Sequence, residues 1–239
     1  MFASRLVSSL IIKRSTKVKI RAIIYDLDGT ILNSGKRGFD RLGLLAQQNN
    51  IDFGIYTQGR LKELWGLPPV DLIMTGLEVA KGVAEEIHRQ WIEWDKKDPI
   101  PLVDGVVGML KKNIREGIAN FLFTSRHTGS AHDVLMRYRI VSFFEDAIGI
   151  DGGAFVSMSE FRKPDPRSLD NLLQFIDENY GISRNEIAYV GDEIFDILCG
   201  MGAGLKTYGV LSGLKKKEEL IAAGAIEENI FPTVAHIVF

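Results

Sequence analysis

Short apolar runs recur along the chain, and segments with helical spacing of apolar residues lie between and after them. The apolar runs cover residues 18–25, 118–123, 187–190 and, more weakly, 205–210. The helical patterns cover residues 103–115, 130–138, 167–180 and 215–223. Continuous apolar runs of this length are typical of strands that are buried on both faces of a parallel sheet. The alternation predicts right-handed βαβ units and an α/β fold with a doubly wound, Rossmann-like sheet.

An insert at residues 33–101 separates the first two predicted strands and is too long for a simple crossover. Its pattern is helical, and one face of a helix collects six residues at steps of three or four: Leu77, Ala80, Ala84, Ile87, Trp91 and Trp94. A proline-containing segment at residues 98–101 ends this pattern, because proline lacks a backbone N–H. An aromatic stripe at helical spacing is more typical of a packed core than of a ligand pocket.

These patterns divide the chain into three predicted parts. Residues 1–17 form an N-terminal extension, residues 18–32 and 102–239 form the Rossmann-like core, and residues 33–101 form a small all-helical cap. Residues 1–20 are basic and contain no acid, which is also the composition of an organelle transit peptide. The favoured interpretation is a short extension of a cytoplasmic protein, and organelle targeting is the minor alternative.

Composition excludes several classes of protein. The 239 residues hold 29 Lys and Arg against 31 Asp and Glu, so the net charge of −2 argues against nucleic-acid binding. The single cysteine, Cys199, excludes a disulfide framework and a cysteine metal cluster. No apolar run approaches the roughly 18–20 residues that span a bilayer, so we expect no membrane partner. The oligomeric state is left open.

The most informative chemistry follows the first strand, where the sequence reads D-L-D-G-T at residues 26–30. Ligands of doubly wound sheets bind beyond the carboxyl ends of the strands. Asp26 and Asp28 therefore lie where a substrate is expected. Two neighbouring carboxylates can coordinate a hard cation such as Mg²⁺, or divide the roles of nucleophile and proton carrier. The alternative is a pair of turn or capping aspartates.

Three further polar motifs stand at or after later strands. Thr124 and Ser125 follow the second strand, where hydroxyl and backbone N–H groups can hold phosphate oxygens. Lys163, between Arg162 and Pro164, can neutralise an aspartate and a phosphoryl group. Asp192 and Asp196 follow the strand at 187–190 and offer two more carboxylates for a hard cation. Each motif alone has a structural alternative, namely a helix cap, a solvated turn lysine or a helix start rich in acids.

Together the motifs resemble those of the haloacid dehalogenase superfamily, in the same order along the chain. The four segments are D-L-D-G-T, L-F-T-S-R, R-K-P-D-P and V-G-D-E-I-F-D. The helical insert resembles the type-one cap of the phosphoglycolate phosphatase-like branch, and Gly66-Leu67-Pro68 is similar to the cap loop that leans over its active site. The chain departs from the branch at Asn33, where an acid is frequent, and at Ser125, where asparagine is frequent.

The resemblance implies a phosphatase that hydrolyses a small phosphorylated metabolite through an aspartyl-phosphate. Asp26 would be the nucleophile and Asp28 the proton carrier, with Thr124 and Lys163 holding the phosphoryl oxygens. Mg²⁺ would be bound by Asp26, the backbone carbonyl of Asp28 and Asp192, with Asp196 as ligand or support. A phosphomutase of the same superfamily and a non-enzymatic phospho-aspartate switch are the alternatives.

The core motifs leave nothing to recognise the remainder of the substrate, so we expect the cap to select it. A cationic side chain beside the cap loop suits a small anionic substrate. Arg60 and Gly66 are therefore predicted, with Ser125, to contact it.

Overall fold

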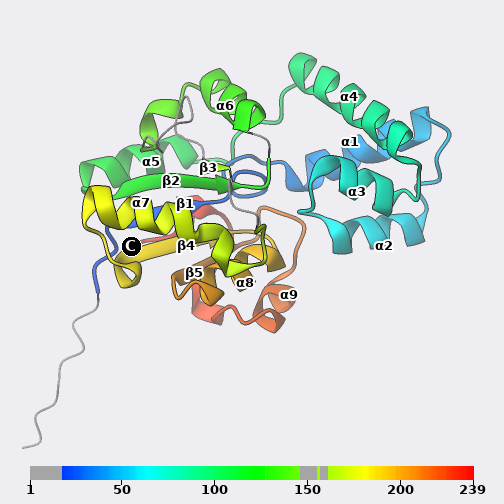
Figure 1. The fold of residues 1–239 in the computed structure, drawn as a ribbon. Coiled ribbons are helices and arrows are strands. Elements are labelled where there is room, and N and C mark those ends of the chain that lie inside the picture. Colours follow the sequence, from blue (N-terminus) through cyan, green and yellow to red (C-terminus); the bar gives the residue numbers. More distant parts are fainter. Residues whose placement is uncertain (1–17, 127, 146–154, 157–160) are drawn as a thin grey trace, which may run out of the picture.

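The computed structural model describes residues 18–126, 128–145, 155–156 and 161–239. These residues form one parallel sheet in the strand order β3-β2-β1-β4-β5-β6 (Figure 1). The order reverses at the first strand, so the predicted α/β, doubly wound, Rossmann-like sheet is confirmed. The N-terminal extension at 1–17 and its targeting alternative lie outside the described residues. The strands are β1 (Ala22–Tyr25), β2 (Ala119–Thr124), β3 (Phe155–Val156), β4 (Ile187–Gly191), β5 (Lys206–Val210) and β6 (Ile230–Phe231).

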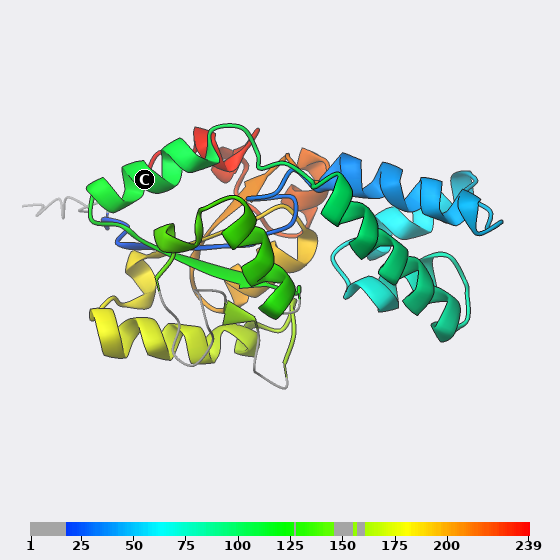
Figure 2. The same ribbon diagram turned by 90° about the horizontal axis from the view of Figure 1, so that it is seen from above.

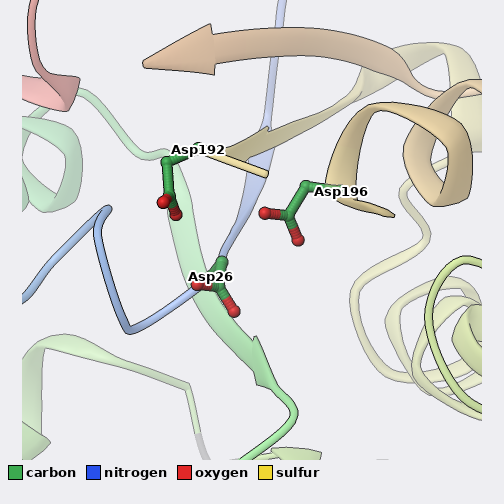
Figure 3. A group of neighbouring side chains, drawn as sticks. All are labelled: Asp26, Asp192 and Asp196. Atoms are coloured by element: carbon green, nitrogen blue, oxygen red, sulfur yellow. The ribbon is translucent and has the colours of Figure 1, made fainter. Parts of the chain in front are cut away.

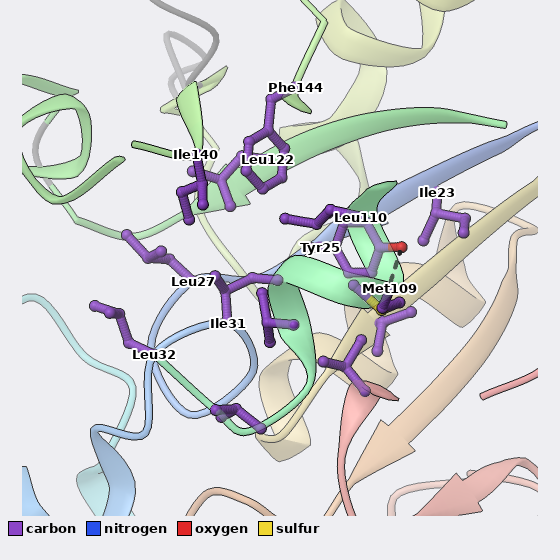
Figure 4. Close-up of a cluster of buried hydrophobic side chains, with 14 of the residues drawn as sticks. Ile23, Tyr25, Leu27, Ile31, Leu32, Met109, Leu110, Leu122, Ile140 and Phe144 are labelled. Atoms are coloured by element: carbon purple, nitrogen blue, oxygen red, sulfur yellow. Dashed lines mark hydrogen bonds between the residues drawn. The ribbon is translucent and has the colours of Figure 1, made fainter. Parts of the chain in front are cut away.

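Helices cover both faces of the sheet (Figure 2). On β1, Ile23 and Tyr25 join an apolar cluster with α5 (Val106–Arg115) and α6 (Thr128–Arg137), part of which Figure 4 shows. Ala22 and Ile24 face the opposite side, where α7 (Asp170–Tyr180) and α8 (Ile194–Gly202) pack. This alternation is the two-residue period of a strand, and it buries both faces of β1. The short helix α9 (Lys217–Ala222) follows β5.

The predicted insert contains four helices: α1 (Gly35–Gln48), α2 (Ile55–Leu64), α3 (Pro69–Gly76) and α4 (Lys81–Lys97). They enclose an apolar cluster of their own, separate from the two clusters beside the sheet. We call residues 33–101 the cap; Figure 1 shows its helices on one side of the sheet. The two chain segments that connect it to the core lie side by side, because Leu32 and Leu102 form an antiparallel bridge. The predicted domain boundaries at 33 and 101 stay a prediction.

Several elements differ from the sequence-based expectation. The six apolar residues from Leu77 to Trp94 do not belong to one helix. Leu77 directly follows α3, and Ala80 directly precedes α4 and is exposed. The sequence did not predict α8, which contains two glycines, or the two-residue strands β3 and β6. In the described residues, no helix combines the length and the apolar character that a membrane crossing requires.

A buried hydrogen-bond network ties α5 to the sheet centre. The Nδ2 of Asn113 donates to the Tyr25 hydroxyl at 2.7 Å and to the Asn120 Oδ1 at 2.9 Å. The Nδ2 of Asn120 donates to the Phe143 carbonyl at 3.0 Å. These side chains are at most 3 % exposed, so each polar atom depends on its protein partner.

We expect Asn113→Ala to destabilise the fold by about 1–3 kcal/mol, because the buried Tyr25 hydroxyl and Asn120 Oδ1 lose the Asn113 amide and keep only their longer hydrogen bond of 3.5 Å to each other. Urea unfolding followed by circular dichroism measures the change. Lys112→Ala, at the exposed neighbouring position, is the control and should change stability by less than about 0.5 kcal/mol. Equal midpoints for the two variants would show that the network contributes nothing.

Candidate active site

Three buried carboxylates meet at the carboxyl end of the sheet centre (Figure 3). Asp26 directly follows β1, and its backbone N–H continues the ladder to the Val190 carbonyl of β4 at 2.9 Å. Asp192 follows β4, and Asp196 lies in the first turn of α8. One oxygen from each carboxylate lies within 4.8 Å of the other two. The structure therefore brings together three of the four aspartates that the sequence predicted for a metal.

Lys163 holds two of these carboxylates together. Its Nζ lies 2.7 Å from the Asp26 Oδ1 and 2.7 Å from the Asp196 Oδ1, and its side chain is 6 % exposed. Burial opposes the charge of the ammonium, but Asp196 and Asp26 outweigh that effect and hold the pKa of Lys163 above its usual value. The alternative of a solvated turn lysine is wrong.

Burial has the opposite effect on the carboxylates. It raises the pKa of Asp26 to about 7 despite the Lys163 ammonium, and the Asp196 carboxylate contributes to the rise. The pKa of Asp192 is also raised, by burial first and then by the neighbouring carboxylates of Glu193 and Asp196. The three carboxylates carry more negative charge than the Lys163 ammonium offsets, and a bound cation would supply further positive charge.

Two glycines make room for Asp192. A Cβ at Gly29, whose φ is +79°, would lie 2.1 Å from the Asp192 Oδ2, and a Cβ at Gly213 would lie 1.9 Å from the same oxygen. The Thr30 hydroxyl donates to the other oxygen at 3.2 Å. The D-G-T turn and the loop after β5 therefore form a narrow slot around this carboxylate.

Asp28 is not a member of the carboxylate cluster. Its two oxygens accept hydrogen bonds from the Arg126 guanidinium, at 2.9 Å from Nε and 2.6 Å from Nη2. Burial alone would raise the pKa of Asp28, but Arg126 outweighs burial and holds it below the usual value. The expected metal role of the Asp28 backbone carbonyl stays a prediction.

The two hydroxyl residues after β2 differ in burial. Thr124 is buried, and its Oγ1 accepts a hydrogen bond from the Arg126 N–H at 3.1 Å. Its hydroxyl hydrogen can therefore point to a ligand. Ser125 is exposed, and both side chains line the same cavity as Asp26 and Lys163.

This cavity has a volume of about 560 Å³ and lies between the core and the cap. Gly66 of the cap loop borders it, and a Cβ there would touch Glu193 and Phe195 of the core at 3.4 Å. Trp91 of α4 also lines the cavity, although its spacing favoured a position in the cap core, which it partly shares. Trp94 lies under the guanidinium of Arg41, 5.1 Å from its ring centroid.

Arg60 does not reach the cavity. Its Nε donates to the Gly76 carbonyl at 2.9 Å, and its Nη1 pairs with Glu78 at 2.9 Å. It is not among the described residues that line the cavity. These partners lie on the cap itself, so the expected contact of Arg60 with the substrate has no structural basis.

Sequence reasoning missed three charged residues at the site. Arg126 is the last residue of the L-F-T-S-R motif, whose hydroxyl groups alone were interpreted. Its position directly after a predicted strand could have indicated a place in the site. Glu193 and Lys215 pair at 3.5 Å and are both buried, and the Lys215 Nζ also donates to the Lys62 carbonyl of the cap. No local pattern indicates this pair. Burial raises the pKa of Glu193 to about 8, and its Oε1 has no hydrogen-bond partner in the described structure.

The chain is similar to known hydrolases. The pattern of the haloacid dehalogenase-like hydrolase family matches residues 23–210. The phosphoglycolate phosphatase of Vibrio cholerae is 26% identical over 217 residues, which cover 85% of this chain and 90% of that protein. The pyrophosphatase PpaX of Listeria monocytogenes is 25% identical over 212 residues, covering 84% of this chain and 88% of that protein.

A solved structure supports the same assignment of fold. The crystal structure of a hydrolase from Pseudomonas syringae has a TM-score of 0.65 at 22% identity, covering 89% of this chain and 94% of that one. The family match spans both strands that carry the acidic cluster and the whole insert between β1 and β2. The resemblance drawn from the four motifs is thereby confirmed, and the chain belongs to the haloacid dehalogenase-like hydrolase family.

Proposed function

We propose that the protein is a Mg²⁺-dependent phosphatase that hydrolyses a small phosphate monoester through an aspartyl-phosphate on Asp26. The observation that carries this proposal is the position of Asp26. Its carboxylate follows the central strand and lies 2.7 Å from the Lys163 Nζ, beside Asp192 and Asp196. It also lines the cavity between core and cap. Phosphatases among the relatives of this chain support the same reaction class.

The carboxylate cluster fits a hard divalent cation. Mg²⁺ takes oxygen ligands and is usually held by one or two carboxylates together with substrate oxygens. Asp192 has one hydrogen bond in the described structure, from Thr30, so it has an oxygen left for an ion. Asp196 accepts from Lys163 and Tyr189 at Oδ1 and from the Glu193 N–H at Oδ2. Asp192 is therefore the direct ligand with Asp26, and Asp196 positions Lys163.

In the first step, an Asp26 oxygen attacks the phosphorus, and the bond to the leaving alcohol breaks. Bound Mg²⁺ would offset the repulsion between the anionic carboxylate and the anionic phosphate. Lys163 donates to the phosphoryl oxygens while it holds Asp26, and Thr124 adds its hydroxyl hydrogen. Asp28 gives a proton to the leaving oxygen.

In the second step, water attacks the aspartyl-phosphate, Asp28 accepts a proton from that water, and Asp26 is regenerated with release of inorganic phosphate. Asp28 is anionic at this point because it gave its proton to the leaving oxygen, and the anion is the form that this step requires. Before the first step, the pair with Arg126 favours the anion. The entering phosphate therefore takes Arg126 from Asp28, and Asp28 then binds a proton from solvent, which it passes to the leaving oxygen.

Asp26→Asn tests the nucleophile. An amide cannot serve as an effective nucleophile at phosphorus, so we expect kcat to fall by about 10³-fold or more. Burial raises the pKa of Asp26, so loss of its charge should not lower the melting temperature. Phosphate release from p-nitrophenyl phosphate measures the rate, and Asp177→Asn, at an exposed site on α7, is the control. A folded Asp26→Asn variant with more than a few per cent of the wild-type rate would assign the nucleophile elsewhere.

Asp192→Asn and Asp196→Asn distinguish the ligand from its neighbour. We expect Asp192→Asn to raise the Mg²⁺ concentration for half-maximal activity by about 100-fold or more, and Asp196→Asn by about 10-fold. Asp196→Asn should chiefly lower kcat at saturating Mg²⁺, because Lys163 loses a charged partner. Mg²⁺ titrations of activity after chelation provide both values. Equal shifts would contradict the ranking, and full activity in excess chelator would exclude the metal.

A further inference from the structure

The cavity extends well beyond the groups that can hold a phosphoryl group and a metal. Its volume of about 560 Å³ lies within the range of roughly 300–1,000 Å³ for sites that enclose drug-sized ligands. The catalytic side chains occupy the core end. The remaining wall is largely apolar, and its side chains come mainly from the cap: Trp65, Leu67, Leu72, Trp91, Ile92 and, from α8 of the core, Phe195.

Two of the charged groups near this apolar wall belong to ion pairs. Asp95 is paired with Arg41, and Lys96 lies 2.7 Å from Glu93. Arg137 is exposed and donates to the Asp95 carbonyl at 3.1 Å. An anionic group on the substrate would have to displace Glu93 to pair with Lys96.

Lys215, beside the cavity, is likewise occupied. It pairs with Glu193 at 3.5 Å and donates to the Lys62 carbonyl of the cap. Burial and the Arg126 guanidinium lower the pKa of His88, which favours its uncharged form. The wall of the outer cavity is therefore largely apolar, and Arg137 is the cation in its described lining that has no carboxylate partner.

We infer that the alcohol released from the substrate carries an apolar ring that lies against Trp91 and Phe195. This inference rests on the proposed phosphatase function and adds the class of leaving group. Trp65 and Trp91 lie 6.3 Å apart between ring centroids, at an interplanar angle of 36°. They form an aromatic surface. An apolar ring that packs against it is removed from water, which favours binding.

Three esters of primary alcohols separate the possibilities: 2-phenylethyl phosphate, ethyl phosphate and phosphoglycolate. We expect kcat/KM for 2-phenylethyl phosphate to exceed that for ethyl phosphate by about 10-fold or more, chiefly through a lower KM. We also expect kcat/KM for 2-phenylethyl phosphate to exceed kcat/KM for phosphoglycolate. If either phosphoglycolate or ethyl phosphate has a kcat/KM equal to or above that of 2-phenylethyl phosphate, the inference is overturned and the phosphatase function stands. No phosphate release from any ester in Mg²⁺ would instead refute the phosphatase function.

Two tryptophans of α4 supply a matched pair of variants. Trp91 lines the cavity, whereas Trp94, one turn later, is not among the described residues that line it. Trp91→Leu should lower the ratio of the kcat/KM values for 2-phenylethyl and ethyl phosphate by about 5-fold or more, and Trp94→Leu should leave that ratio unchanged. Equal effects would overturn the assignment of Trp91. Phe195→Leu, from the core side, should lower the ratio as well. It tests the inference if Trp91→Leu has a melting temperature too low for the assay.

Discussion

The centre of this structure is built around the electrostatic repulsion among the carboxylates of Asp26, Asp192 and Asp196. Their oxygens lie within 4.8 Å of one another and are buried, so desolvation and like charge both act against ionisation. The chain offsets part of this charge with the buried ammonium of Lys163. Lys163 comes from the segment before α7, so this segment must lie against the sheet edge for the site to exist. The site and the doubly wound topology therefore depend on each other.

The positions of the acidic site residues could be predicted because they follow from the direction of the strands and from a doubly wound strand order. Parallel strands end at one edge of a sheet, so acids that follow β1 and β4 must be neighbours there once both strands are recognised. The pairings of the charged side chains could not be predicted. Arg60 illustrates this, because its charge and proximity to the cap loop suggested a substrate contact, yet Gly76 and Glu78 hold it.

The errors in secondary structure have similar physical causes. Gly200 and Gly202 lower the helix propensity of α8, which forms because its apolar side packs on β4 and β5. Strands β3 and β6 contain two residues each and produce no periodic pattern. The step from Leu77 to Ala84 kept helical spacing by coincidence across the turn between α3 and α4.

The relation between cap and core explains how an apolar wall can serve a reaction of charged groups. The cap is joined to the core through the paired linkers at Leu32 and Leu102, and Lys215 reaches from the core to the Lys62 carbonyl. These contacts hold Trp91 and Gly66 beside the cavity that Asp26 lines. An apolar leaving group against these side chains would displace water from the cavity, and interactions between charges strengthen when water is excluded. In the proposed reaction, the side chains that would select an apolar leaving group would therefore also strengthen the interaction of Lys163 with the phosphoryl oxygens.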